Sequence, residues 1–378
     1  MILKMYDYYN IKIDYAKGIY IYSKNGEKYI DTFSGIGVLA LGHSNEELIL
    51  ALKNKIDKYM HLSNYFLDED AQWVANKLVE LTGERGTVFF TNSGTESTEA
   101  ALKAVKKLST KKKNKIIFFK NGFHGRTLGA LSINGFEKLK APFRPLIPYC
   151  NELDFNDVKG FKDYMEFHGD EVLAVFLETI LGSGGIIPIT QEFADVLNYY
   201  KKEKKYILVC DEIQAGLGRT GKFFSYENFN LKPDMITIGK AIGGGLPLGA
   251  TIFLNETANI LKSGDHGSTF APNPIALSGA RFLLEKIPHM LDNIRKKSNY
   301  FFNKLNNINS YKISDIRGIG LMIGIELADS YFDLRKKAFE KKLLLNVISN
   351  NSIIRLLPAL NIQYSEIDDI ISILEELL

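Results

Sequence analysis

Two short apolar runs, each ending at a single charged residue, constrain the fold of this chain more than any other feature. Residues 206–210 and 235–239 form these runs, and Asp211 and Lys240 follow them directly. Short apolar runs bounded by glycine and polar residues are typical of buried parallel strands. Ligands in open α/β sheets bind at the carboxyl ends of such strands. We therefore expect Asp211 and Lys240 to face one cleft.

Strand-like runs recur through the middle of the chain. Residues 87–91 and 172–177 are two more, and they end at Asn92 and Glu178. Helix-like segments separate these runs between residues 87 and 254. Regular alternation of strands and helices predicts a mostly parallel, doubly wound sheet.

The two ends of the chain follow a different pattern. Residues 15–31 predict a β-hairpin, and a long helix that Pro288 could interrupt begins after residue 274. The short strands and closing helix that follow are typical of a smaller α+β unit. We therefore predict an N-terminal segment of the small domain at residues 1–45, a large domain at 46–280 and a C-terminal small domain at 281–378.

The composition argues against several classes of protein. A net charge of +3 on 378 residues gives no reason to expect nucleic-acid or membrane partners. Cys150 and Cys210 are too few for a disulfide framework and lack metal-ligand neighbours at suitable spacing, so we expect a reducing compartment and no metal site. The sequence shows neither a signal-peptide pattern nor an apolar run long enough to span a membrane. We therefore expect a cytoplasmic protein.

A small, polar turn opens the helix that follows residues 87–91. It contains Ser93, Gly94 and Thr95. The free N–H groups and the positive dipole end at a helix N-terminus bind phosphate. Helix capping alone would also explain these residue types, so the turn predicts a phosphate site only together with other features.

A loop at residues 121–127 gathers an aromatic ring, an imidazole and a guanidinium, those of Phe123, His124 and Arg126. The phenylalanine could stack on a planar ligand, and the arginine could bind a carboxylate through two hydrogen bonds. A core phenylalanine and a surface arginine are the alternative interpretation of this loop taken by itself.

Together these features match the requirements of pyridoxal 5'-phosphate. An amine that bonds an aldehyde must be partly neutral near pH 7, so burial or nearby cations must lower its pKa, and Lys240 lies among glycines that allow close approach. A buried carboxylate such as Asp211 keeps a pyridine nitrogen protonated. Phe123 and Ile213 could cover the two ring faces, and Gln214 could reach the ring hydroxyl.

Longer runs of sequence resemble a known family. The runs that are similar to class III aminotransferases of fold type I are NSGTESTEAALKAVKK, GFHGRTLGALS, VCDEIQAGLGRTG, ITIGKAIGGGLPLGA and GSTFAPNP. The acetylornithine and ornithine subgroup is the most similar, through GIYIYSKNGEKYIDTFSGIGVLALGH, HLSNYF and IIRLLPALNI. The resemblance covers essentially the whole chain. It implies an α/β, fold type I enzyme with a large, doubly wound sheet domain that binds the cofactor, and a smaller α+β domain built from both chain ends. It also implies a homodimer with shared active sites.

The resemblance further implies roles for individual residues. Lys240 would bond the cofactor and carry protons, and Asp211 would pair with the pyridine nitrogen. Arg355 would hold the α-carboxylate of the keto acid, Arg126 the carboxylate of a donor whose distal amine reacts, and Thr269 the phosphate of the neighbouring subunit. The expected cofactor contacts are Ser93, Gly94, Thr95, Phe123, His124, Glu178, Asp211, Ile213, Gln214, Lys240, Ser268 and Thr269. The expected substrate contacts are Asn64, Arg126, Ser183 and Arg355.

Ser183 departs from the pattern of the subgroup. Acetylornithine-type members usually carry a glutamate here, which neutralises the substrate arginine when a distal amine enters. Without it Arg355 stays available, which favours α-amino and α-keto carboxylates. We expect ping-pong transamination between 2-oxoglutarate and N-acetylornithine, ornithine or a similar acylated diamino acid. The alternatives are an ω-amino acid or 4-aminobutyrate aminotransferase that uses pyruvate or 2-oxoglutarate and, from other reaction classes, a pyridoxal-phosphate racemase or decarboxylase.

Overall fold

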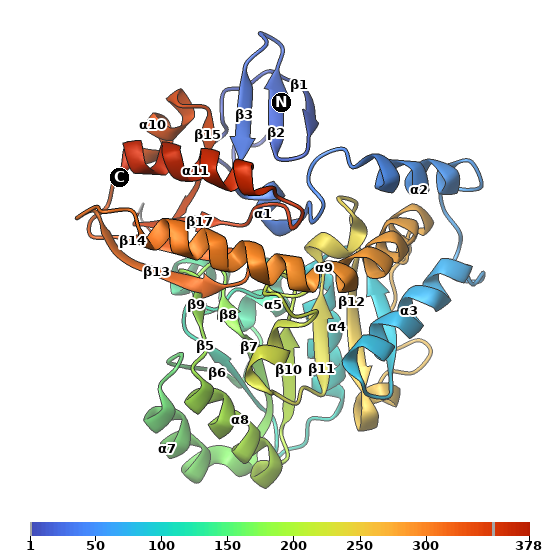
Figure 1. Cartoon of the computed structure of the whole chain (residues 1–378). Coiled ribbons are helices and arrows are strands. Elements are labelled where there is room, and N and C mark those ends of the chain that lie inside the picture. Colours follow the sequence, from blue (N-terminus) through green and yellow to red (C-terminus); the bar gives the residue numbers. More distant parts are fainter. Residues whose placement is uncertain (1, 350–351) are drawn as a thin grey trace.

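The structure is a computed structural model that describes residues 2–349 and 352–378, and a seven-stranded sheet lies at its centre (Figure 1). The strand order is β4 (Gly86–Thr91), β12 (Gly249–Leu254), β11 (Met235–Ile238), β10 (Ile207–Asp211), β7 (Val172–Glu178), β5 (Lys115–Phe119) and β6 (Cys150–Leu153). β7 is buried along its whole length, as expected of a parallel strand that is covered on both faces. The predicted large, mostly parallel sheet is confirmed.

One strand of this sheet, β12, runs antiparallel to both of its neighbours, β4 and β11. Only residues 239–248 connect β11 to β12, whereas a parallel crossover needs roughly a dozen residues or more. β4 keeps the direction of the remaining strands because β12 lies between it and them. The carboxyl ends of β4, β7, β10 and β11 therefore lie along one edge of the sheet.

The long helices that follow strands of the large sheet are α4 (Gly94–Lys107), α7 (Val158–His168) and α8 (Gln191–Lys204). α4 packs against β4, β11 and β12. Its buried face is rich in small residues, including Ser97, Ala100 and Ala104, which let the helix lie close to the sheet. This close packing fixes the start of α4 beside the ends of β10 and β11.

Two smaller, four-stranded sheets are built from the ends of the chain. Their strand orders are β1 (Ile13–Lys17), β2 (Tyr20–Ser23), β3 (Lys28–Asp31), β15 (Leu343–Leu344), and β13 (Ile313–Ile319), β14 (Met322–Leu327), β17 (Ile353–Leu356), β16 (Asn346–Ile348). β3 pairs in parallel with β15, so the two chain ends lie side by side (Figure 1). β2 and β3 confirm the predicted hairpin, while β1 adds a mostly exposed strand that pairs with β2.

A single 33-residue helix, α9 (Pro274–Asn306), crosses between the large sheet and the smaller ones (Figure 1). Pro288 does not interrupt it. A proline inside a helix costs about 3 kcal/mol. Burial of one face of α9 against α2 (Glu46–Ile56), α3 (Glu69–Thr82) and α11 (Tyr364–Leu377) offsets this cost. The boundary predicted at residue 280 lies within α9, and the division into domains stays a prediction.

The remaining helices and strands are short. They are α1 (Ser34–Gly37), α5 (Leu128–Ser132), α6 (Glu137–Lys140), α10 (Leu334–Glu340), β8 (Ile180–Leu181) and β9 (Ile187–Pro188). Within the described residues, no helix combines the length and the apolar character needed to cross a membrane.

Candidate active site

The carboxyl edge of the large sheet holds a cavity of about 220 Å³. The residues that line it are Gly94, Thr95, Phe123, His124, Gly125, Arg126, Glu178, Asp211, Ile213, Gln214 and Lys240. All of them except Gly125 belong to the set predicted from the sequence. The structure thus brings Asp211 and Lys240 into one cavity, as the positions of the strand ends predict.

Asp211 ends β10 and is buried, with 4 % of its surface exposed. His124 Nδ1 lies 2.6 Å from Asp211 Oδ2, and the Ile213 N–H donates to Oδ1 at 3.1 Å. Burial disfavours a charged imidazole, but the hydrogen bond and the charge of Asp211 outweigh it and raise the pKa of His124. The contact with His124 therefore holds the Asp211 carboxylate in a fixed orientation.

Glu178 ends β7 and lies opposite Asp211 in the register of the two strands. Its Oε1 accepts the N–H of Phe123 at 2.7 Å, and its Oε2 accepts the N–H of Gly182 at 3.2 Å. Burial raises the pKa of Glu178 to about 7, although His124 and the two N–H groups favour the charged form. Glu178 therefore joins two loops of the site and titrates near neutral pH.

Lys240 follows β11 in a left-handed backbone conformation, with a φ of 48°. This conformation costs a residue other than glycine about 1–3 kcal/mol and tends to occur at functional sites. A Cβ on the preceding Gly239 would lie 2.9 Å from Gly94 Cα, so glycine is needed for this close approach. Burial lowers the pKa of Lys240 against the opposing charges of Asp211 and Glu178. The site therefore favours the neutral amine that a reaction with an aldehyde requires.

The start of α4 forms one end of the cavity. The first N–H groups of a helix have no partner within it, and they lie at the positive end of the helix dipole. A Cβ on Gly94 would lie 2.7 Å from Ile213 Cγ2, so glycine lets the helix begin this close to the loop after β10. Ser93 Oγ accepts the N–H of Glu96 at 3.4 Å as the helix cap. Gly94 and Thr95 therefore fit a phosphate, and a contact from Ser93 stays a prediction.

Phe123 and Arg126 border the cavity from the loop after β5. The Arg126 guanidinium carbon lies 5.5 Å from the centre of the Phe123 ring, in the range of a cation–π contact. Phe123 is half-buried and Arg126 is exposed. The alternative interpretation of this loop was a core phenylalanine and a surface arginine. Only the surface arginine matches the structure. Arg126 can meet a carboxylate that arrives from solvent.

Arg355 on β17 is buried and makes its hydrogen bonds with neutral groups. Its Nη1 donates to the Gly182 carbonyl at 2.9 Å and to Gln214 Oε1 at 3.4 Å, and its Nε donates to Asn346 Oδ1 at 2.8 Å. Burial lowers the pKa of Arg355 to about 10. Among the residues that the structure describes, no carboxylate lies within ion-pair distance of Arg355.

Two residues beside Arg355 bear on its charge. Ser183 follows Gly182 in the turn between β8 and β9, so the position where related enzymes carry a glutamate does lie next to the arginine. Asn346 orients the guanidinium and was missed in the sequence. The signal that could have found it is the single amide at the end of the apolar run Leu343-Leu344-Leu345.

Six predicted residues do not line the cavity: Ser93, Ser183 and Arg355, described above, and Asn64, Ser268 and Thr269. Asn64 Nδ2 donates to the Ser268 carbonyl at 2.8 Å, and Asn92 Nδ2 donates to Ser268 Oγ at 2.9 Å. Asn64 and Thr269 are exposed. Asn64, Ser268 and Thr269 form a second group that is tied to the end of β4, and their contacts with cofactor or substrate stay predictions.

The cavity residues fit pyridoxal phosphate. The cavity is smaller than the about 300–1,000 Å³ typical of sites for drug-sized ligands, which suits a cofactor with a single ring. It brings an amine, a buried carboxylate, an aromatic wall and a helix start together. A Cβ at Gly125 would lie 2.1 Å from Thr95 Oγ1, so glycine also keeps this end of the cavity open.

Comparison with known proteins identifies the family. The profile described as "Aminotransferase class-III" matches residues 3–378. The chain therefore belongs to the class III aminotransferases, and its cofactor is pyridoxal phosphate. The predicted family, enzyme class and cofactor are confirmed.

Individual relatives point to one subgroup. The chain is 40 % identical to an acetylornithine aminotransferase from Aquifex aeolicus, over 97 % of this chain and 97 % of that protein. It is 37 % identical to an acetylornithine aminotransferase from Bacillus subtilis, over 99 % and 97 % of the two chains. An ornithine aminotransferase structure from Toxoplasma gondii matches with a TM-score of 0.93 at 26 % identity, covering 100 % of this chain and 92 % of that one. The N-acetylornithine aminotransferase of Stenotrophomonas maltophilia matches with a TM-score of 0.84 at 29 % identity, over 97 % and 95 %.

Proposed function

We propose that this enzyme transfers the amino group of N-acetylornithine, or of ornithine or a similar acylated diamino acid, to 2-oxoglutarate by a ping-pong mechanism. The observation that carries the proposal is the placement of the Lys240 amine in one cavity with Asp211 and Arg126. The Aquifex and Bacillus relatives, which are named acetylornithine aminotransferases, support the choice of donor.

The cavity residues divide the binding of the cofactor among them. Lys240 would hold it covalently, Asp211 would contact the ring nitrogen, and the start of α4 would hold the phosphate. Phe123 and Ile213 would cover the two ring faces. When bound, pyridoxal phosphate supplies an aldehyde that bonds amines and a ring that withdraws electrons from the bonded carbon.

Lys240 has two tasks in the proposed reaction. Because burial lowers its pKa, the Lys240 amine loses its proton more readily than an exposed lysine, and in its neutral form it can accept a proton from the reacting carbon of the donor. The resulting ammonium can return this proton in the next step. The Asp211 carboxylate, which His124 holds in place, would stabilise positive charge on the ring nitrogen.

Two arginines fit the two carboxylates that the reaction must recognise. We assign Arg355 to the α-carboxylate of the keto acid, because its present partners are neutral and leave its charge for an incoming anion. We assign Arg126 to the carboxylate of a donor whose distal amine reacts. Its exposed position at the cavity suits this task.

A second candidate donor is an ω-amino acid such as 4-aminobutyrate, with pyruvate or 2-oxoglutarate as acceptor. The observation that favours it over N-acetylornithine is Ser183, because the glutamate typical of the acetylornithine subgroup is missing at this position. N-acetylornithine remains the first proposal because it also explains the relatives at 40 % and 37 % identity.

We also propose a cytoplasmic homodimer with shared sites. Large apolar side chains are exposed beside Ser268 and Thr269: Met60, Tyr65, Phe66, Leu67 and Phe270. Exposed apolar patches of this kind are typical of protein interfaces. A second copy that covers the patch would bring Thr269 toward the cofactor phosphate of its partner. Both cysteines are unpaired, which supports a reducing compartment.

Half-reactions with single donors test the proposed substrate. The enzyme loaded with pyridoxal phosphate is mixed with N-acetylornithine, ornithine, 4-aminobutyrate or alanine, and the absorbance of the bound cofactor is followed. We expect N-acetylornithine to change the absorbance at the lowest concentration. No change with N-acetylornithine, together with a change with 4-aminobutyrate, would replace the first proposal by the second.

A further inference from the structure

Residues 57–67, which connect α2 to α3, form an exposed segment with an unusual surface. Tyr65 is 96 % exposed, Leu67 is 75 % exposed and Phe66 is 69 % exposed. Exposed apolar side chains favour collapse onto the nearest surface, so an extended segment of this kind needs a device that holds it out.

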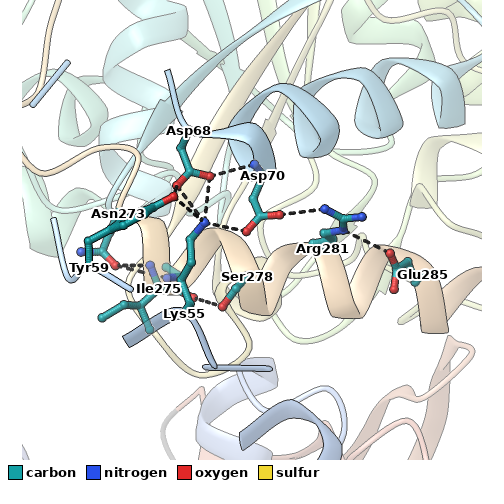
Figure 2. A network of polar contacts seen from close by, with 10 residues as sticks. Lys55, Tyr59, Asp68, Asp70, Asn273, Ile275, Ser278, Arg281 and Glu285 are labelled. Carbon is teal, nitrogen blue, oxygen red and sulfur yellow. Dashed lines mark hydrogen bonds and ion pairs between the residues drawn. The ribbon is translucent and has the colours of Figure 1, made fainter. Parts of the chain in front are cut away.

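A network of buried charges closes the two ends of this segment (Figure 2). Lys55 Nζ, in the last turn of α2, lies 2.8 Å from Asp68 Oδ2 and 2.9 Å from Asp70 Oδ2 at the start of α3. The Tyr59 hydroxyl donates to Asp68 Oδ2 at 2.9 Å. The side chains of Lys55, Asp68 and Asp70 are only 9 %, 5 % and 14 % exposed.

The network continues onto α9. Arg281 Nη1 lies 3.0 Å from Asp70 Oδ1, so Asp70 joins Lys55 of α2 to Arg281 of α9 (Figure 2). Arg281 also pairs with Glu285 at 3.3 Å, so the network holds two cations and three carboxylates. Burial disfavours the charge of Lys55, but the hydrogen bonds to Asp68 and Asp70 outweigh this and raise its pKa.

The middle of the segment is attached to the loop that precedes α9. Asn273 Nδ2 donates to the Met60 carbonyl at 3.2 Å, and Asn64 Nδ2 donates to the Ser268 carbonyl at 2.8 Å. The His61 ring lies 5.7 Å from the Phe270 ring. Movement of the segment would therefore move the loop that carries Ser268 and Thr269.

A buried ion pair adds little net stability compared with apolar side chains, and in some proteins its role is to select one arrangement of the chain. We propose that Lys55 is a positioning residue: with Asp68 and Asp70 it clamps the ends of residues 57–67, and through this segment it holds the 267–270 loop in place. The clamp itself is independent of the reaction. Its value to catalysis rests on the proposed role of Thr269 at the phosphate of a second copy.

Amide hydrogen exchange of the loaded enzyme tests the clamp. In Lys55→Met we expect exchange in peptides covering residues 57–67 and 267–270 to become about tenfold faster or more, because the opening of a local unit is set by its own contacts. Exchange in β7, at the centre of the large sheet, should stay unchanged. The dissociation constant of pyridoxal phosphate should rise, while kcat with saturating cofactor should change less than threefold.

A matched control is the exposed ion pair between Lys286 and Glu47, which also joins α9 to α2 at 2.6 Å. Lys286→Met should leave exchange in both segments unchanged. Equal acceleration in both variants, or no acceleration in Lys55→Met, would overturn the proposal. Faster exchange without any change in cofactor affinity would keep the clamp and refute the proposed role of Thr269.

A milder variant covers the case in which Lys55→Met does not fold. Asp70→Asn keeps the contact between Lys55 and Asp68 and weakens the link to Arg281. We expect a smaller but still local acceleration of exchange in residues 57–67. Uniform acceleration over the whole chain in Asp70→Asn would identify the network as general stabilisation and overturn the positioning role.

Discussion

The surroundings of Asp211 and those of Thr269 differ in how far this one chain buries them. Asp211 is buried, and its carboxylate is held by His124 and by a backbone N–H of the same chain. Thr269 lies on an exposed loop that is anchored by Asn64 and Asn92 and bordered by exposed apolar side chains. Both regions were predicted to contact one cofactor.

The difference separates the part of the site that one chain preorganises, around Asp211, from the part that it leaves exposed to solvent, around Thr269. Groups whose charge must be controlled lie at strand ends. There, packing and hydrogen bonds fix their positions, and burial shifts their pKa. Groups on the second region are held in place but not covered, which supports the proposal that another copy completes them. Substitutions near Asp211 should therefore change the chemistry, and those near Thr269 should change cofactor binding and assembly.

The largest effect should come from Lys240→Ala. We expect turnover to fall by about 10⁴-fold, the upper end for loss of a general acid and base, even though the variant should still fold. Steady-state transamination measures this. Lys205→Ala is the control, because Lys205 is also left-handed but lies at the exposed end of α8. Borohydride reduction and peptide mapping should find the cofactor on Lys240, and label on another lysine would contradict the assignment.

Asp211→Asn should have the next largest effect. The neutral amide cannot stabilise positive charge on the ring nitrogen, so we expect turnover to fall by about 10³-fold, in the range for removing one preorganised electrostatic contact. The pKa of His124 should fall as well, because the partner that raises it is gone. NMR titration of His124 checks this, and an unchanged pKa would show that Asp211 is not the group that raises it.

The titration of Glu178 should appear in the stability of the cofactor-free protein. Its pKa is raised from 4.5 to about 7, so between these values the folded state binds a proton that the unfolded state does not. The resulting stabilisation, at most about 3 kcal/mol, is complete below pH 4.5 and is lost as the pH rises through 7. We expect Glu178→Gln to flatten the dependence of the unfolding free energy on pH, as measured by urea denaturation. An identical slope in both proteins would contradict the raised pKa.

Thr269→Ala tests the proposed contact of the exposed 267–270 loop with the cofactor. Loss of a hydrogen bond to a charged group costs about 1.5–3 kcal/mol, so we expect pyridoxal phosphate to bind about tenfold or more weakly in the dimer. Turnover at saturating cofactor should stay close to that of the unaltered enzyme. If turnover falls and the affinity for pyridoxal phosphate does not, Thr269 acts on the chemistry. The proposed division, in which Asp211 serves the chemistry and Thr269 serves cofactor binding, would then be wrong.

Ser183→Glu should have the smallest effect, on selectivity alone. A carboxylate beside Gly182 could pair with Arg355 when a distal amine enters, so we expect the ratio of kcat/KM for N-acetylornithine to that for alanine to rise about three- to tenfold, or about 1 kcal/mol. Ser183→Gln is the control for size. An equal rise in both variants would mean that the charge at this position does not control Arg355.

The sequence predicts the surroundings of Asp211 far better than those of Thr269. Asp211, Glu178 and Lys240 could be found because a strand end is a local pattern and parallel strands share one edge. The antiparallel direction of β12 could have followed from its short connection. Asn346 could be singled out only as an amide at the end of an apolar run; its contact with Arg355 and the Lys55 clamp could not be predicted, since they depend on how distant parts of the sequence pack together. No spacing rule brings Arg281 to Asp70.

The edge position of β4 also affects how the chain is made. Among the residues that the structure describes, β4 pairs in the large sheet with β12 alone, so the strand that leads into α4 gains its partner only when residues 249–254 have been synthesised. At about 5–20 residues per second this is a delay of roughly 10–30 s, during which β4 exposes unpaired backbone groups. The nascent chain is therefore most open to wrong strand pairing, and to chaperones, while the middle of the protein is leaving the ribosome.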